Sequence, residues 1–267
     1  MNPIVETYSQ LAAQYDGDEN MHSCWGMASD KALASLRLRD RHERVVDVGC
    51  GSGRALRELA ARAAITREFI GIEPAQNMRH LACRLTRPYP SIRILDGAFE
   101  AIPIETGTVD YLFSILAFHW TTDLEQSVRE LHRVLKPNGE MDLFFIGRQN
   151  GQEFIRATTP IFLRCMGPIE LLKSASMRRQ LTQEAAARLF QMEFGDRVSV
   201  QESFDTYYDT LEGHWNWWVR IEGHFLQIPT DKRIACDRDV KHALASLQTR
   251  AGIPYTIHLL HVQVRSV

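Results

Sequence analysis

The stretch that decides the fold is Arg44-Val-Val-Asp-Val-Gly-Cys-Gly-Ser-Gly-Arg54. Its β-branched residues Val45, Val46 and Val48 form a short apolar run, which is typical of a central strand covered on both faces. Three glycines then occupy alternate positions, and the segment from residue 55 has the apolar spacing of a helix. This order lets the backbone approach a ligand closely, because glycine lacks a Cβ and a helix N-terminus follows.

Composition and charge limit the classes of protein to which this chain can belong. The chain has 267 residues, of which 45% are hydrophobic and 24% charged, enough for a large globular core. A net charge of -2 supplies no general attraction for nucleic acid. Five cysteines without a C-x-x-C pair indicate free thiols in a reducing compartment. With no leader-like or membrane-spanning pattern, we expect a soluble cytoplasmic protein without nucleic-acid or membrane partners.

Short apolar strands alternate with helical segments through the first half of the chain. After the strand at 45–48, the pattern predicts strands at 68–72, 92–95, 109–114 and 140–147. Lys136-Pro-Asn-Gly139 predicts a turn before the last of these. Such alternation favours an α/β fold with a doubly wound, mostly parallel sheet.

The alternation lapses from residue 150. Helical patterns at 154–166 and 182–192 indicate an insertion over one edge of the sheet, and strands are predicted at 197–204 and 254–264. Helical patterns are also expected at 4–16, 29–38, 211–228 and 231–250. The predicted division is an N-terminal helical lid at 1–39, a cofactor-binding core at 40–149, a helical insertion or substrate cap at 150–195, and a C-terminal part of the core with a Trp-rich helix at 196–267.

An acidic residue follows the strand beside the glycine turn. Glu73 ends that strand, and in a parallel sheet its carboxylate reaches the crevice where ligands bind. There the carboxylate can accept hydrogen bonds from both hydroxyls of a ribose, which predicts a nucleoside-bearing cofactor. Dinucleotide binding requires G-x-G-x-x-G with a third glycine at position 54, and Arg54 stands there instead.

The glycine pattern resembles that of class I S-adenosylmethionine-dependent methyltransferases. Their signature, an acidic residue followed by three alternating glycines, matches Asp47, Gly49, Gly51 and Gly53. Further ordered matches extend the resemblance over about residues 40–147. The resemblance implies a seven-stranded Rossmann-like sheet with a helical insertion after strand five, an N-terminal helical lid, and S-adenosyl-L-methionine as cofactor.

The resemblance also implies a set of cofactor-binding residues. They are Tyr8, Tyr15, Asp47, Gly49, Cys50, Gly51, Glu73, Pro74, Met78, Ala98, Phe99, Ser114 and Ile115. One departs from the pattern, because Ala98 replaces the aspartate that accepts from the adenine amino group in the family's Gly-Asp-Ala-Glu loop. Adenine recognition then rests on backbone groups near Phe99, on ring contact, or on Asp96. Tyr8 and Tyr15 either cover the cofactor or simply pack in an amphipathic helix.

One histidine and three tryptophans are candidates for contact with the methyl acceptor. His119 follows the fourth strand and can act as a base near neutral pH, although an ordinary helix-entry histidine is the plainer interpretation. The adjacent Trp120 can form one wall of a pocket for an apolar substrate. Trp215 and Trp218 share a helical face, so they line a substrate pocket or pack in the core. The spacing of the histidines and cysteines predicts no metal site.

Together these observations predict a methyltransferase acting on a small molecule. The segment after the fourth strand lacks the Asn/Asp-Pro-Pro-Tyr/Phe motif typical of relatives that methylate nucleobase or glutamine amides, and resemblance to branches that methylate small carboxylic acids and natural products favours O-methylation. One alternative uses the cofactor differently, for example by intramolecular cyclisation of the cofactor. Others are a non-catalytic partner subunit with the same fold, and a nucleic-acid or protein methyltransferase.

Overall fold

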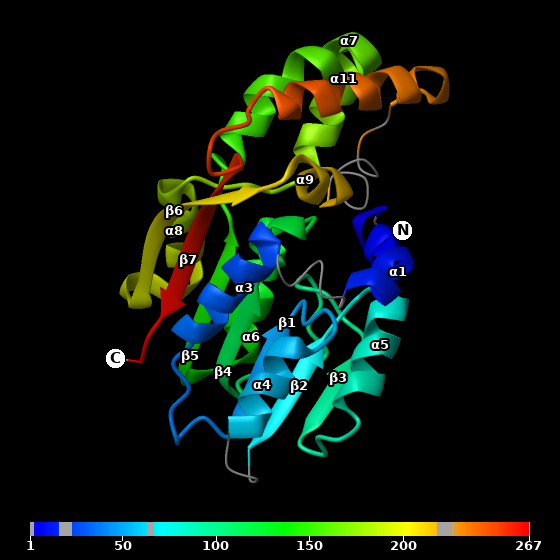
Figure 1. Ribbon diagram of the computed structural model, residues 1–267. Helices are drawn as coiled ribbons and strands as arrows, with labels where there is room; N and C mark the ends of the chain where they lie inside the picture. The colour runs from blue at the N-terminus through cyan, green and yellow to red at the C-terminus, as the bar shows by residue number, and fades with distance from the viewer. Residues whose placement is uncertain (1–2, 16–22, 63–66, 218–225, 227, 267) are drawn as a thin grey trace.

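The fold is built on a seven-stranded sheet (Figure 1). The computed structural model describes residues 3–15, 23–62, 67–217, 226 and 228–266. Across the sheet the strands are β3 (Ile92–Leu95), β2 (Glu68–Ile72), β1 (Arg44–Val48), β4 (Val109–Ile115), β5 (Leu135–Ile146), β7 (Ile253–Val264) and β6 (Val198–Asp209). Neighbours from β3 to β5 are parallel, whereas β7 is antiparallel to both β5 and β6. The predicted doubly wound α/β sheet is confirmed.

Helices cover both faces of this sheet. The helices of one face are α3 (Cys24–Ser35) and α4 (Arg54–Arg62), and those of the other are α6 (Leu124–Val134) and α8 (Gln183–Phe194). In β1, Val45 belongs to the apolar cluster under the first pair, and the next residue, Val46, belongs to the cluster under the second. Alternate side chains of a strand point to opposite faces, so a β1 covered on both sides must be apolar at every such position.

The N-terminal helix α1 (Pro3–Tyr15) packs against α5 (Gln76–Thr86) beside the sheet. The contact buries Ala12 with Met78 and Leu81 in a small cluster of its own. The Ser9 hydroxyl also accepts from the first turn of α5, at 3.0 Å from the Asn77 amide nitrogen. The packing holds α1 next to the carboxyl end of β2, where α5 begins.

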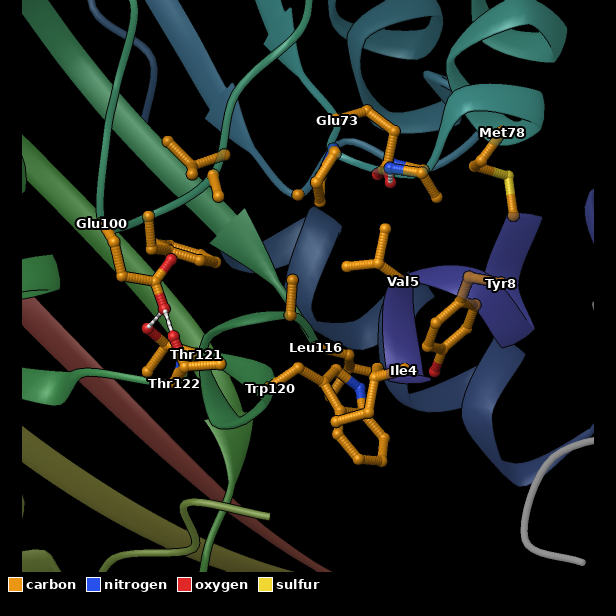
Figure 2. A pocket seen from close by; sticks show the side chains of 18 of the residues that line it. Ile4, Val5, Tyr8, Glu73, Met78, Glu100, Leu116, Trp120, Thr121 and Thr122 are labelled. Carbon is orange, nitrogen blue, oxygen red and sulfur yellow. Dashed lines mark hydrogen bonds between the residues drawn. The ribbon is translucent and has the colours of Figure 1, made fainter. Parts of the chain in front are cut away.

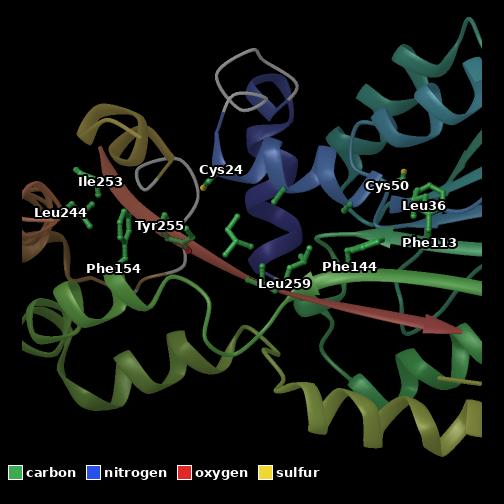
Figure 3. Close-up of a cluster of buried hydrophobic side chains, with 14 of the residues drawn as sticks. Cys24, Leu36, Cys50, Phe113, Phe144, Phe154, Leu244, Ile253, Tyr255 and Leu259 are labelled. Carbon is green, nitrogen blue, oxygen red and sulfur yellow. The ribbon is translucent and has the colours of Figure 1, made fainter. Parts of the chain in front are cut away.

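A separate group of helices stands beyond the carboxyl ends of the strands. Figure 1 shows α7 (Gln152–Ser176) crossing α11 (Arg233–Ala245) there, with α9 (Leu211–Trp217) beside them. Figure 3 shows the buried cluster that joins this group to the sheet, running from Phe113 and Phe144 through Tyr255 to Phe154 and Leu244. Inside α7 the chain kinks at Gly167, which has a φ of 81° and precedes Pro168.

The predicted cap of residues 150–195 corresponds only in part to this group. Its first helix, α7, lies there, but its second helix, α8, packs on α6 and β6. Ala186, Phe190 and Phe194 are spaced four residues apart and bury one face of α8 against the sheet. The expectation for α8 is therefore corrected, because this helix covers the sheet. The helices that lie beyond the carboxyl ends of the strands are α7, α9 and α11.

Two predicted boundaries also differ from the structure. The turn expected at 136–139 lies inside β5 as a bulge, because Val109 pairs with Leu135 whereas Tyr111 pairs with Glu140. Helix α3 begins at Cys24 and not near residue 29, because the Ser23 hydroxyl caps it by accepting from the Gly26 amide. Three short 3-10 turns complete the described elements: η1 (Phe118–Trp120), η2 (Gly195–Arg197) and η4 (Thr230–Lys232).

Candidate active site

A cavity of about 280 Å³ opens at the carboxyl ends of β1, β2 and β4, closed on one side by α1 (Figure 2). Its volume is near the lower end of the range for small-molecule sites. The lining residues come from five separate stretches of the sequence, at 4–8, 48–51, 73–78, 98–100 and 115–122. They are Ile4, Val5, Tyr8, Val48, Gly49, Gly51, Glu73, Pro74, Ala75, Met78, Ala98, Phe99, Glu100, Ile115, Leu116, Ala117, Trp120, Thr121 and Thr122.

The glycine turn forms the floor of the cavity. Gly49 has a φ of 77° and Gly51 a φ of 55°, a region that other residues rarely adopt. The amides of Gly49 and Cys50 both donate to the Ile72 carbonyl, at 2.8 and 3.0 Å, so the turn is fixed to the end of β2. A Cβ on Gly49 would lie 2.4 Å from the Ala117 Cβ, so glycine is required there by its backbone and by its neighbour.

We expect Gly49→Ala to destabilise the fold by about 1–3 kcal/mol through overpacking and backbone strain, and to weaken cofactor binding. Urea unfolding and calorimetry measure the two effects. Gly107→Ala is the matched control, because Gly107 has a similar φ of 66° but nothing within 4 Å of the added Cβ. Equal losses in both variants would mean that contact with Ala117 contributes nothing.

Glu73 presents its carboxylate at the side of the cavity. One oxygen accepts from the Gly51 amide and the other from the Ala75 amide, both at 2.9 Å. Burial raises the pKa of Glu73, while these two amides and the guanidinium of Arg79 oppose the rise. Since each carboxylate oxygen has a second lone pair, the group can accept two further hydrogen bonds from a ligand.

The opposite end of the cavity is apolar and aromatic. Figure 2 shows Tyr8 of α1 facing Trp120 of η1, and their ring centroids lie 6.2 Å apart in an edge-to-face arrangement. The guanidinium of Arg178 lies 5.1 Å from the centre of the Trp120 ring. Leu116 completes this wall with a φ of 55°, which is unusual for a residue with a Cβ and marks a constrained turn at the end of β4.

Comparison with known proteins identifies the domain that holds this cavity. Residues 46–142 match the family described as a methyltransferase domain. The chain carries a class I methyltransferase domain. The match confirms the predicted family, whose cofactor is S-adenosylmethionine, and the strand order agrees with its Rossmann-like fold.

Individual relatives support the same family over part of their length. The chain is 35% identical over 112 residues to an uncharacterised methyltransferase, OB1106, of Oceanobacillus iheyensis, covering 41% of this chain and 49% of the relative. It is 38% identical over 95 residues to malonyl-[acyl-carrier protein] O-methyltransferase 1 of Coxiella burnetii, covering 36% and 30%. The alignments thus span about half of the first curated relatives or less.

The likeness in structure covers more of the chain. The YcgJ protein of Bacillus subtilis superposes with a TM-score of 0.61 at 16% identity, covering 91% of this chain and 99% of the other. At this identity the likeness concerns the fold alone. The structural likeness also covers regions before residue 46 and after residue 142, where the match to the methyltransferase family ends.

Most of the residues expected to bind the cofactor meet at the cavity. Those that line it are Tyr8, Gly49, Gly51, Glu73, Pro74, Met78, Ala98, Phe99 and Ile115, together with the expected acceptor wall Trp120. Three others lie behind it: Asp47, Cys50 and Ser114 are buried and are not among the lining residues. One Asp47 oxygen has no hydrogen-bond partner among the described residues, and burial, with Glu73 nearby, raises its pKa well above the ordinary value.

His119 is not brought to the cavity. Its ring is buried beside Trp120, and its Nδ1 atom has no hydrogen-bond partner within the described residues. Burial and the charge of Arg178 hold its pKa well below the ordinary value. In a 3-10 turn successive side chains point about 120° apart, so Trp120 reaches the cavity and His119 turns away from it. The expected role as a base therefore has no support in this structure.

Trp215, the expected substrate-pocket tryptophan whose side chain the structure describes, does not line the cavity either. Trp215 packs against the cluster between the sheet and α7, with the Lys241 ammonium 5.4 Å from the centre of its ring. This position agrees with the core-packing alternative. Trp218 and the side chain of Tyr15 lie outside what the structure describes.

Several lining residues were missed by the sequence analysis. Ile4 and Val5 share α1 with Tyr8, and the helical spacing of Ile4 and Tyr8 was the signal available for the first of them. Glu100 stands in the loop expected near adenine, two residues after Ala98. No sequence pattern marks Leu116, whose place depends on the turn after β4.

The described residues provide neither a metal-binding cluster nor a membrane-spanning helix. No group of three or more histidine, cysteine, aspartate or glutamate side chains is arranged to hold a metal ion in the part of the chain that the structure describes. Among the described helices none is long and apolar enough to cross a membrane.

Proposed function

We propose that this protein is an S-adenosylmethionine-dependent methyltransferase that acts on a small molecule. The observation that carries the proposal is the composition of the one cavity described above. Glycine backbone and the Glu73 carboxylate form one part of it, and the apolar wall of Tyr8, Leu116 and Trp120 forms another. A cofactor with a polar nucleoside and a reactive methyl group requires both kinds of surface.

The cavity residues fit this cofactor at the level of their chemistry. The Glu73 carboxylate has the two remaining acceptor positions that a ribose diol needs. Gly49 leaves the space that a Cβ would fill, and so lets the turn lie close to a ligand. We assign Met78, Ala98 and Phe99 to the adenine, and the carbonyl of Ile115 to the methionine ammonium.

We further propose oxygen as the acceptor atom, in particular the oxygen of an ionised carboxylic acid. The titratable side chains lining the cavity in the described residues are Tyr8, Glu73 and Glu100, and they include no histidine or lysine. A carboxylate nucleophile needs no base, because it is deprotonated at neutral pH. The Coxiella relative is named as an O-methyltransferase of malonyl-[acyl-carrier protein], which is consistent with an acid acceptor.

The bound cofactor supplies a methyl group already activated on a sulfonium. The chain then has to align the acceptor with that group and exclude water. We assign the alignment of the acceptor to the wall formed by Tyr8, Leu116 and Trp120. Helix α1, which carries Tyr8, closes the cavity on this side. The four-part division of the chain, with its lid and cap, remains part of this proposal, with α8 reassigned to the sheet layer.

The test is to measure S-adenosylhomocysteine binding by calorimetry and then to assay turnover with matched acceptors. Medium-chain and aromatic carboxylic acids, with the alcohol and amine of the same skeleton, are incubated with S-adenosylmethionine, and mass spectrometry identifies the products. We expect alkali-labile methyl esters from the acids alone, at a rate that does not rise above neutral pH. Methylthioadenosine as product would instead indicate another cofactor reaction. Absence of S-adenosylhomocysteine binding would overturn the proposal.

A further inference from the structure

Glu100 places a second carboxylate on the cavity, at the end formed by the loop after β3. It lies two residues after Ala98 and next to Phe99, and all three line the cavity. Figure 2 shows its side chain reaching from this loop to Thr121 and Thr122, which follow η1. Glu100 therefore joins two loops that close the same end of the site.

The hydrogen bonds of this carboxylate are concentrated on one oxygen. Oε1 accepts from the Thr121 hydroxyl at 2.6 Å, from the Thr122 amide and hydroxyl at 2.5 and 2.7 Å, and from the Asp123 amide at 3.3 Å. Among the described residues, no other residue donates a hydrogen bond to the second oxygen, Oε2, although the amide of Glu100 itself also interacts with this carboxylate. The four donors fix the orientation of the group and leave Oε2 as an open acceptor.

Glu100 is also held in its charged form. Although burial raises its pKa, the hydrogen bonds from Thr121 and Thr122 outweigh this effect and lower the pKa below the ordinary value. An ionised carboxylate accepts hydrogen bonds and cannot donate them. At neutral pH Oε2 therefore suits a ligand N–H and repels a ligand carbonyl.

The other acceptors near this end are less well placed for a ligand amino group. The Ala98 side chain is a methyl group, and its backbone amide and carbonyl both pair with Ala101. Asp96 is bound to the Arg79 guanidinium at 3.1 Å, is 72% exposed and is not among the lining residues. Glu73 lies elsewhere on the wall, where it accepts from the Gly51 and Ala75 amides, and its remaining acceptor positions are assigned to the ribose.

We propose that Oε2 of Glu100 accepts a hydrogen bond from the exocyclic amino group of the cofactor's adenine, replacing the aspartate that Ala98 lacks. The proposal rests on the proposed function, since it requires S-adenosylmethionine in this cavity. It assigns base recognition to a side chain anchored from the loop after β4. Adenine specificity is therefore linked to the conformation of Thr121 and Thr122.

Glu100→Gln tests the assignment with little change in shape. The four donors keep the amide oxygen at the position of Oε1, so the amide NH2 group replaces Oε2 and an acceptor becomes a donor. Calorimetry compares the binding of S-adenosylhomocysteine with that of S-inosylhomocysteine, in which an oxygen replaces the amino group. We expect the wild-type preference for adenine to fall by about tenfold to a hundredfold in the variant, with inosine binding improved.

Glu130→Gln is the matched control. Glu130 also holds this loop, accepting from the Ile102 amide at 2.9 Å and pairing with Arg133, but it does not line the cavity. It should leave the adenine-to-inosine ratio unchanged. Adding Ala98→Asp to Glu100→Gln should restore the preference for adenine.

The outcomes separate the two proposals. Equal weakening of both ligands by Glu100→Gln, or no change in either, would overturn the role of Glu100 while leaving the methyltransferase intact. Failure of the wild-type protein to bind S-adenosylhomocysteine would overturn the proposed function itself. An adenine preference that survives in Glu100→Gln but is lost on reshaping the backbone at Ala98 would assign recognition to the backbone.

Discussion

Glu73→Gln is expected to weaken S-adenosylhomocysteine binding by about a hundredfold or more, the value for loss of one or two hydrogen bonds to a charged group. Each carboxylate oxygen of Glu73 already accepts one hydrogen bond from a backbone amide, one from Gly51 and the other from Ala75. Whichever way the glutamine amide turns, its NH2 group faces one of these donors. The substitution therefore removes an acceptor from the cavity and also disturbs the glycine turn. Calorimetry measures the dissociation constant.

The opposite end of the same strand supplies the control. Glu68 begins β2, its side chain is 33% exposed, and it pairs with Arg44 and Arg93 away from the cavity. Glu68→Gln should leave the dissociation constant within about twofold, because exposed ion pairs contribute little. An unchanged dissociation constant in Glu73→Gln would contradict the assignment of this carboxylate to the cofactor.

Asp142→Ala is expected to lower the free energy of unfolding by about 3–5 kcal/mol, the cost of breaking a buried ion pair. The Asp142 side chain is fully buried in β5 and accepts from the Tyr111 hydroxyl at 2.5 Å, from the His261 ring at 2.6 Å and from the Arg265 guanidinium at 2.6 Å. Removing the carboxylate leaves these donors without their shared acceptor. Urea unfolding at neutral pH measures the loss.

The effect of Asp142 should also depend on pH. Burial raises its pKa, but hydrogen bonds from His261, Arg265 and Tyr111 outweigh this and lower the pKa from 3.8 to about 2. A lowered folded pKa means that the stabilisation is fully present above the unfolded value of 3.8 and is lost as the pH falls through about 2. The shift corresponds to about 2 kcal/mol. The stability difference between wild type and Asp142→Asn should therefore shrink over that interval.

Asp205→Ala serves as the surface comparison for this prediction. Asp205 pairs with Lys31 in an ion pair whose side chains are 31% and 52% exposed, so its removal should cost less than about 1 kcal/mol. If Asp142→Ala cost no more than Asp205→Ala, the buried network around β5 would not be a major source of stability.

Local patterns in the sequence were sufficient for the core of the fold. The apolar run of β1, the alternating glycines and Glu73 predicted a strand, a tight turn and an acid at the neighbouring strand end, and the structure has all three. These features follow from local rules: β-branched residues favour buried strands, and positive φ values favour glycine. The parallel order of the strands then brings their carboxyl ends to one edge.

The sequence by itself therefore determined the class I sheet, the glycine turn and the acid beside it, while the tertiary structure alone decided which side chains face the cavity. His119 and Trp120 are adjacent, yet only Trp120 lines it, because the 3-10 turn sends them in different directions. Glu100 is a candidate because Thr121 and Thr122 donate to one of its oxygens, an arrangement that only the tertiary structure creates. Side-chain direction in a loop depends on contacts between segments distant in sequence, and no local pattern encodes them.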